Sequence, residues 1–196
     1  MITIDEITIV RDGREIIYDY SEQIPAGSIT VIVGANGCGK STLLAAIAGD
    51  IAPVKGTITI DDVHPILTSP AQLAQIRAVA IQNQSYTLGF TVQQVIEMAG
   101  ASAQVMQALE LTDLAHRQVT ALSGGETARV SIATAIAQDT PVLLLDEPLA
   151  AQDLHSRKRI IELLQKLAEE GKTIVVVAHS SESELSWADK VIKQFH

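Results

Sequence analysis

The sequence predicts a layered α/β fold, because short apolar runs rich in β-branched residues alternate with amphipathic helical patterns. The clearest helical pattern spaces Ile160, Leu163, Leu164 and Leu167 so that one apolar stripe faces a sheet. Buried strands that alternate with such helices are typical of layered α/β proteins. The runs expected as strands are residues 2–10, 28–33, 56–60, 78–82, 142–145 and 173–178.

One stretch breaks this alternation. Between Thr91 and Asp113 the pattern predicts two consecutive short helices, at 91–98 and 102–109, with no strand between them. We interpret this stretch as a small helical insertion into the α/β core.

Length and charge limit the possible functions. A chain of 196 residues is long enough for one well-buried domain and short for two. Its 14 basic and 23 acidic side chains give a net charge of −9, opposite in sign to most duplex-binding proteins. Aromatic residues make up only 3%, which argues against a stacking platform for single strands. We expect no nucleic-acid partner.

Cys38 is the single cysteine, which excludes an internal disulfide and a cysteine-rich zinc site. A reducing cytoplasm is therefore the expected compartment. The first residues lack the features of a signal peptide, and no apolar run is long enough to cross a bilayer. We expect no direct membrane insertion.

Residues 34–41 fit the phosphate-loop pattern, in which a glycine is followed by four residues and then by Gly-Lys-Ser. The loop follows an apolar strand and opens a helix expected at 41–48. Glycines let backbone N–H groups turn toward phosphates, and the helix start adds positive potential. Lys40 is expected on the β- and γ-phosphates and Ser41 on Mg²⁺. The expected nucleotide-binding residues are Gly34, Ala35, Asn36, Gly37, Cys38, Gly39, Lys40, Ser41 and Thr42.

A second candidate segment is the apolar strand at 142–145, which runs directly into Asp146 and Glu147. The carboxyl end of a buried parallel strand is where ligands bind in such folds. We expect Asp146 to hold Mg²⁺ through its water shell. Glu147 is expected to orient or deprotonate the water that attacks the γ-phosphate.

The segment from Leu122 to Glu126 reads Leu-Ser-Gly-Gly-Glu and precedes a helical pattern that runs through Gln138. Ser123, Gly124 and Gly125 therefore form a second helix start that can bind an anion. This segment resembles the signature motif of ATP-binding cassette (ABC) ATPases. The resemblance extends over nearly the whole chain, from about Thr3 to Val191.

The resemblance implies further site residues. Gln82 resembles the glutamine that contacts Mg²⁺ and the attacking water, with Gln84 a rival for that role two residues away. His179, at the end of the strand expected at 173–178, resembles the histidine that contacts the γ-phosphate. Residues 149–153 resemble the loop that crosses between subunits in this family, called the D-loop.

The resemblance also implies an architecture and partners. It implies a phosphate-loop ATPase core with a mixed sheet, an N-terminal antiparallel β-subdomain and a compact inserted helical subdomain. The core and β-subdomain are expected at 1–82 and 120–196, and the helical subdomain at about 83–119. Two copies, or one copy and a paralogous ATPase subunit, would hold two ATP molecules head to tail. Each nucleotide would lie between the phosphate loop of one subunit and Ser123 and Gly125 of the other.

The chain departs from the family pattern at three places. Val10 and Arg11 stand where many relatives carry an aromatic residue that stacks on adenine. Either the Arg11 guanidinium stacks on the base or the base is held loosely. Gln152 replaces a usually apolar D-loop residue, and Ile81 replaces the proline that usually precedes Gln82.

The leading functional hypothesis is the ATPase subunit of a membrane transporter, held at the inner face of the cell membrane through permease subunits. Residues 89–98 resemble importers of iron-siderophore, haem or cobalamin type. A soluble assembly role, such as iron–sulfur cluster assembly, and the ATPase of an exporter remain alternatives. The transported solute stays open, because in this family the membrane and solute-binding subunits choose it. The direction of transport and the choice between homodimer and heterodimer stay open as well.

Overall fold

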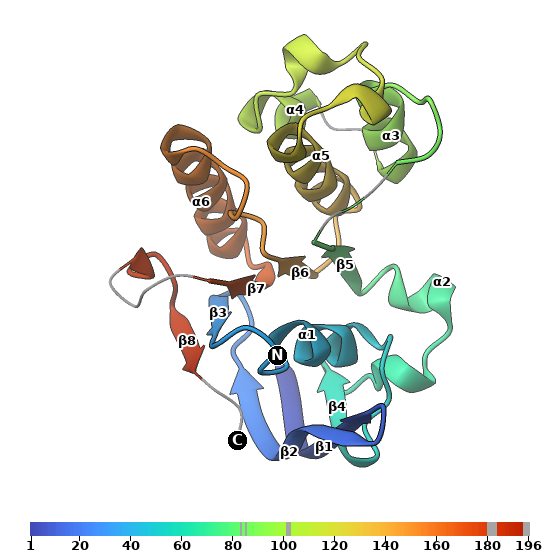
Figure 1. Cartoon of the computed structure of the whole chain (residues 1–196), viewed down its shortest axis with the longest axis vertical. Helices are drawn as coiled ribbons and strands as arrows, with labels where there is room; N and C mark the ends of the chain where they lie inside the picture. The colour runs from blue at the N-terminus through green and yellow to red at the C-terminus, as the bar shows by residue number, and fades with distance from the viewer. Residues whose placement is uncertain (83, 85, 101–102, 180–183, 194–196) are drawn as a thin grey trace.

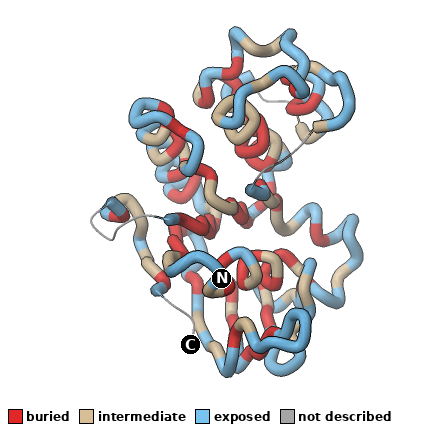
Figure 2. The backbone as a smooth tube through the Cα atoms, viewed as in Figure 1, coloured by how far each residue is buried: buried red, intermediate tan, exposed pale blue. Residues whose placement is uncertain are grey.

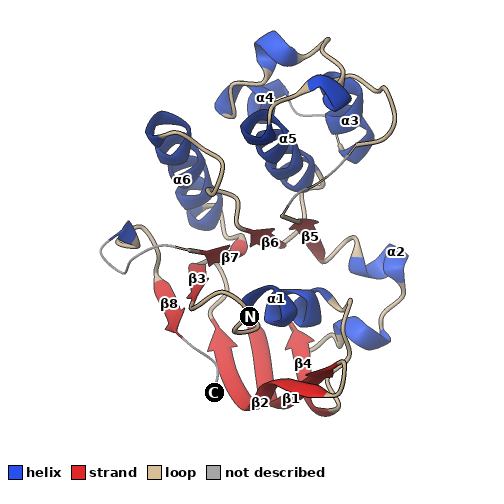
Figure 3. Cartoon of the chain, in the orientation of Figure 1, coloured by secondary structure: helices blue, strands red, loops and turns tan. Residues whose placement is uncertain are grey.

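The computed structural model describes residues 1–82, 84, 86–100, 103–179 and 184–193. Its strands form two separate sheets (Figures 1 and 3). The first sheet is antiparallel, has the order β2-β1-β4, and consists of β1 (Ile2–Arg11), β2 (Arg14–Ile24) and β4 (Lys55–Ile60).

The second sheet is parallel throughout and has the order β5-β6-β7-β3-β8. Because all five strands run the same way, their carboxyl ends meet at one edge. Its members are β3 (Ile29–Val33), β5 (Arg77–Ala80), β6 (Val142–Asp146), β7 (Thr173–Ala178) and β8 (Lys190–Lys193).

Helices form the remaining layers. Helix α1 (Lys40–Ala48) lies between the two sheets, whereas α5 (Gly124–Ala137) and α6 (Leu154–Glu169) cover the opposite face of the parallel sheet (Figure 1). Helices α3 (Val92–Ala99) and α4 (Ala103–Ala108) lie beyond the parallel sheet, beside α5, far from the antiparallel sheet. The short helices are η1 (Pro65–Leu67), α2 (Pro70–Leu73), η2 (Thr112–Leu114) and η3 (Val119–Ala121).

Two apolar cores follow from this layering. One fills the space between the antiparallel sheet, α1 and the near face of the parallel sheet, and the other lies between the far face and the helices that cover it. The alternation of β6 shows the division, because Leu144 points into the first core and Leu143 and Leu145 into the second. Buried residues accordingly concentrate in the parallel sheet, in the helix faces packed on it and on one face of the antiparallel sheet (Figure 2). The described part of the chain contains no helix with both the length and the apolarity to span a bilayer.

The α/β fold predicted from sequence is confirmed, with the antiparallel and parallel strands in separate sheets. All six expected strands exist, with ends that differ by at most a few residues. The expected helices at 41–48 and 91–98 correspond to α1 and α3, and that at 102–109 to α4, although its expected first residue, Ser102, lies outside the described residues. Strands β2 and β8 were not among the expected runs.

The β1–β2 connection is a two-residue turn at Asp12 and Gly13. Both residues have positive φ, 51° and 74°, which matches the twist of a tight hairpin. Arg11 and Arg14 are paired directly across the turn. The hairpin therefore brings two guanidinium side chains to its tip.

Candidate functional site

The carboxyl edge of the parallel sheet gathers most of the predicted site residues. The neighbouring strands β5, β6, β7 and β3 end there, and each leads directly into a predicted segment. Gln82 follows β5, Asp146 ends β6, His179 follows β7, and the phosphate loop begins after β3 at Gly34. The strand order thus brings together residues that lie more than 140 positions apart in the chain.

The phosphate loop turns tightly from β3 into α1. Gly37 and Gly39 have φ of 79° and 103°, in the left-handed region that favours glycine. A Cβ atom on Gly39 would lie 2.9 Å from Ile16 of the hairpin, and one on Gly34 would lie 2.7 Å from the Cys38 sulfur. Backbone direction therefore favours glycine at position 37, close packing favours it at position 34, and both favour it at Gly39.

Lys40 is the first residue of α1 and is only 5% exposed. Its ammonium group donates to the backbone carbonyl oxygens of Gly34 and Ala35, at 2.9 and 3.0 Å. Within the described part of the chain, no side chain caps the start of α1. A buried cation with only neutral partners beside an uncapped helix start is the chemistry that holds phosphate groups.

Ser41 and Asp146 form a pair of oxygen donors next to Lys40. The Ser41 hydroxyl donates to Oδ1 of Asp146 at 3.1 Å. Burial raises the pKa of Asp146, the nearby Glu147 adds to the rise, and the Ser41 hydrogen bond opposes it. A hydroxyl and a partly buried carboxylate fit the oxygen ligands that Mg²⁺ prefers, and a cation there would keep Asp146 ionised.

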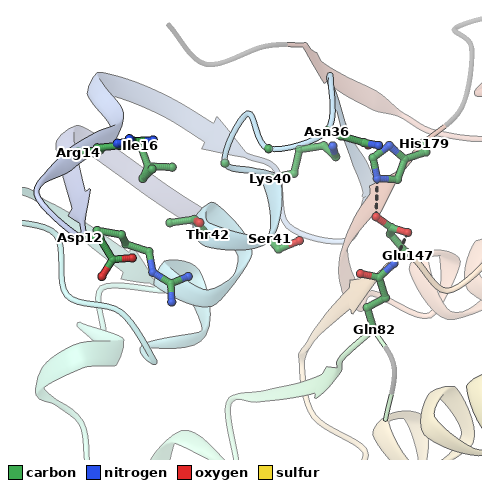
Figure 4. Close-up of a pocket in the computed structure, with 13 residues that line it drawn as sticks. Asp12, Arg14, Ile16, Asn36, Lys40, Ser41, Thr42, Gln82, Glu147 and His179 are labelled. Atoms are coloured by element: carbon green, nitrogen blue, oxygen red, sulfur yellow. Dashed lines mark hydrogen bonds and ion pairs between the residues drawn. The ribbon is translucent and has the colours of Figure 1, made fainter.

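Glu147 lies between two polar side chains from neighbouring strands (Figure 4). The Gln82 amide donates to Oε2 of Glu147, and Nε2 of His179 pairs with Oε1. Its backbone has φ of 51°, uncommon for a side-chain-bearing residue, and its N–H donates to the Val177 carbonyl at 3.0 Å. The carboxylate, 11% exposed, is therefore held in a fixed direction from both sides.

A cavity of about 900 Å³ runs from the hairpin tip to Glu147 and His179 (Figure 4). One end is lined by the hairpin and the other by the catalytic candidates, with the phosphate loop between them. The described residues that line it include no Phe, Tyr or Trp. They are Arg11, Asp12, Arg14, Ile16, Asn36, Gly37, Gly39, Lys40, Ser41, Thr42, Gln82, Glu147 and His179.

The helix start predicted as a second anion site does not line this cavity. Ser123 caps α5, accepting from the Glu126 N–H at 3.3 Å, while its own N–H donates to the Glu126 carboxylate at 2.6 Å. These hydrogen bonds lower the pKa of Glu126. Gly124 lines a separate cavity of about 340 Å³ together with Gln82 and Gln84. Within one chain, the structure therefore does not bring Ser123 and Gly125 to the phosphate loop.

Several residues at these sites were not among those expected. Arg14 and Ile16 line the main cavity because the hairpin carries them back over the phosphate loop. The Asp12-Gly13 pair was the available signal, since this dipeptide is typical of a tight hairpin. Arg129 contacts Gln152, which sequence spacing could not indicate.

The sequence and the fold of the chain both match those of known proteins. The family model described as "ABC transporter" matches residues 17–150 of the chain. The chain belongs to the ABC transporter family. It is therefore an ATP-binding domain of the ABC ATPase class. Its phosphate loop lines the main cavity.

Individual relatives of this ABC ATPase agree with the family match. The hemin import ATP-binding protein HmuV of Rhodococcus jostii is 39% identical over 96% of the chain and 69% of its own length. The achromobactin transport ATP-binding protein CbrD of Dickeya dadantii is 37% identical over 97% of the chain and 77% of its own. A solved structure described as a dimeric post-hydrolysis state of the cassette MJ0796, bound to ADP and Pi, superposes with a TM-score of 0.82. It is 26% identical and covers 100% of this chain and 94% of that one.

Proposed function

We propose that this ABC ATPase drives import of an iron-siderophore complex, haem or another metal-containing cofactor. Two relatives carry the names of hemin and achromobactin transport proteins, which supports this substrate class. The proposal places the chain at the inner face of the cell membrane, held there by permease subunits. Hydrolysis by a head-to-tail dimer, as a homodimer or with a paralogous subunit, would supply the energy.

The observation that carries the catalytic part is the position of Glu147. In the proposed reaction its carboxylate accepts a proton from the water that attacks the γ-phosphate, while Gln82 and His179 hold it in place. Gln82, which contacts Glu147, is preferred over Gln84 as the glutamine of this site. Because both neighbours point at one carboxylate, moving either one would misdirect the base.

The remaining site residues bind and orient the nucleotide. Lys40 and the N–H groups from Gly34 to Thr42 would hold the phosphates, with Lys40 leaving its two carbonyl partners to do so. Ser41 and Asp146 would hold Mg²⁺, with Gln82 as a third ligand. When bound, Mg²⁺ neutralises charge that develops on the phosphate oxygens.

The adenine would lie at the hairpin end of the cavity. Arg11 and Arg14 reach that end from opposite strands of the hairpin, and Ile16 lies against the phosphate loop below them. A guanidinium plane can stack on any base. We therefore propose arginine stacking without strong selection for adenine.

The dimer follows from the location of the second helix start. Ser123 and Gly125 do not line the main cavity of their own chain, so in this proposal a ligand bound by both helix starts requires a second chain. Residues 83–119 form the proposed helical subdomain. Leu88, Phe90 and Met98 are exposed on it, at 63%, 40% and 65%, which suits contact with a permease.

The test uses Glu147→Gln, which removes the base and keeps the shape of the side chain. With ATP and Mg²⁺ this variant should bind nucleotide, fail to hydrolyse it and elute as a dimer by light scattering. Normal turnover would exclude Glu147 as the base. A second experiment tests transport. Vesicles that contain the copurified permease should take up haem or a ferric siderophore only when the ATPase subunits can hydrolyse ATP. If no membrane protein copurifies with the chain, the transport role is refuted.

A further inference from the structure

Gln152 joins the D-loop to the start of α5. The residue is 7% exposed, and its amide makes two hydrogen bonds. Its Nε2 donates to the backbone carbonyl of Gly125 at 3.0 Å, and its Oε1 accepts from Nη1 of Arg129 at 3.2 Å. A buried amide with partners on both sides holds its neighbours in a defined geometry.

The backbone beside Gln152 also packs closely on this helix start. A Cβ atom on Gly125 would lie 2.7 Å from the carbonyl oxygen of Ala151, too close for any side chain without a shift. Gly124 has open space where its Cβ would be. The helix start therefore rests on the D-loop through Gly125 and presents Gly124 outward.

The D-loop is itself fixed at both ends. Glu147 and Pro148 connect it to β6, and Asp153 ends it by capping α6, accepting from the Ser156 N–H at 2.8 Å. Arg129 belongs to the same unit. Among the described residues its buried Nε has no hydrogen-bond partner, and loss of Gln152 would also remove the partner of its Nη1. The position of the helix start relative to β6 thus depends on the Gln152 amide.

We propose that Gln152 is a positioning residue for the nucleotide site of the partner subunit, acting through Gly125. This inference rests on the proposed head-to-tail dimer, in which Ser123 and Gly125 serve the partner's nucleotide. Donors that stabilise a reacting phosphate must be placed accurately, since a misplacement of about 1 Å can reduce a rate about 100-fold. Loss of the Gln152 amide should therefore impair the partner's site and leave the site of its own Glu147 nearly intact.

The experiment uses mixed dimers with one complete site. Lys40→Ala disables the phosphate loop of one chain and Ser123→Arg disables the helix start of the other. Each variant alone should be inactive, and only the mixed dimer combines an intact loop with an intact helix start. If mixing restores no hydrolysis, the shared-site dimer is wrong, and the role of Gln152 falls with it.

Gln152→Leu is then added to one chain at a time. On the Lys40→Ala chain, which donates the helix start, it should lower kcat about tenfold or more. On the Ser123→Arg chain, which supplies the phosphate loop and Glu147, the change should be less than about twofold. Equal losses in both placements, or a loss only on the Ser123→Arg chain, would overturn the inference, because a general packing defect does not depend on placement.

A second variant isolates the bond to Gly125. Gln152→Glu keeps an acceptor for Arg129 and loses the donor to the Gly125 carbonyl, so it should reproduce the placement-dependent loss. Full activity in this variant would also overturn the inference. Gln138→Leu is the matched control, because Gln138 is exposed at the far end of α5 and donates to the Thr134 carbonyl at 3.4 Å. It should change kcat less than twofold in either placement.

Discussion

The two adjacent glycines at the start of α5 should respond in opposite ways to the same added methyl group. In Gly125→Ala the new Cβ would lie 2.7 Å from the Ala151 carbonyl oxygen, and backbone atoms must move to relieve the contact. Overpacking of this kind destabilises by about 2 kcal/mol. For a chain of this size that corresponds to a fall in Tm of about 4–8 °C.

In Gly124→Ala the Cβ enters open space, and alanine is the better helix former by about 1 kcal/mol. The Tm of this variant should not fall. Its hydrolysis should fall about tenfold, because the methyl group stands on the face that the proposed dimer turns toward the partner's ligand.

Calorimetry of the nucleotide-free chains measures the first effect, and steady-state phosphate release measures the second. Both variants should bind nucleotide as monomers with unchanged affinity, since neither residue lines the main cavity. Equal Tm losses in the two variants would refute the close approach of Ala151 to Gly125. Unchanged hydrolysis in Gly124→Ala would refute the outward, ligand-facing role of this helix start.

Three further predictions concern the ligand and the response to acid. Lys40→Ala should weaken ATP binding about 30-fold, because a hydrogen bond from a charged group contributes about 2 kcal/mol. Equilibrium dialysis measures this affinity, and an unchanged affinity would exclude this loop as the phosphate site. Arg11→Ala should raise the Kd for ATP and for GTP alike by about 2- to 5-fold, and an effect on ATP alone would contradict non-selective stacking. The hydrogen bond from the Ser123 N–H lowers the pKa of the Glu126 carboxyl group. The ionised carboxylate therefore stabilises the fold at pH values above the ordinary pKa of glutamate. This stabilisation is lost as the pH falls through the lowered pKa of Glu126. Glu126→Gln should therefore lose less stability on acidification in urea titrations, and a slope equal to that of the parent would count against this linkage.

The phosphate loop and the six strongest strands could be predicted from sequence because their signals are local. In the parallel sheet both faces are buried, so strands such as β6 and β7 read as continuous apolar runs. Strand β2 gives no such signal, since it alternates irregularly and exposes several polar residues, including Asp19 and Gln23. Strand β8 is four residues long with lysine at each end, too short to stand out.

The convergence of Gln82, Glu147 and His179 could be expected only from the family resemblance. Each follows a strand, but the strand order β5-β6-β7 that makes them neighbours is a property of the packed sheet. No local pattern states that the strand before Gln82 pairs with β6 rather than with β3. The residues of the site were therefore predictable one by one, while their contacts needed the fold.

Gln152 illustrates why a departure from a family pattern is informative once contacts are known. From sequence alone, a polar residue at this D-loop position suggests only a more solvated loop. In the structure the side chain is buried and spans 27 positions of sequence to reach Gly125. An amide at such a site would lower stability unless its hydrogen-bonding groups were matched, and both Gly125 and Arg129 supply the match. Glutamine at this position therefore replaces the apolar packing that is usual in the family with hydrogen bonds of defined direction. Because these bonds join the D-loop to the start of α5, they constrain where Gly125 can lie.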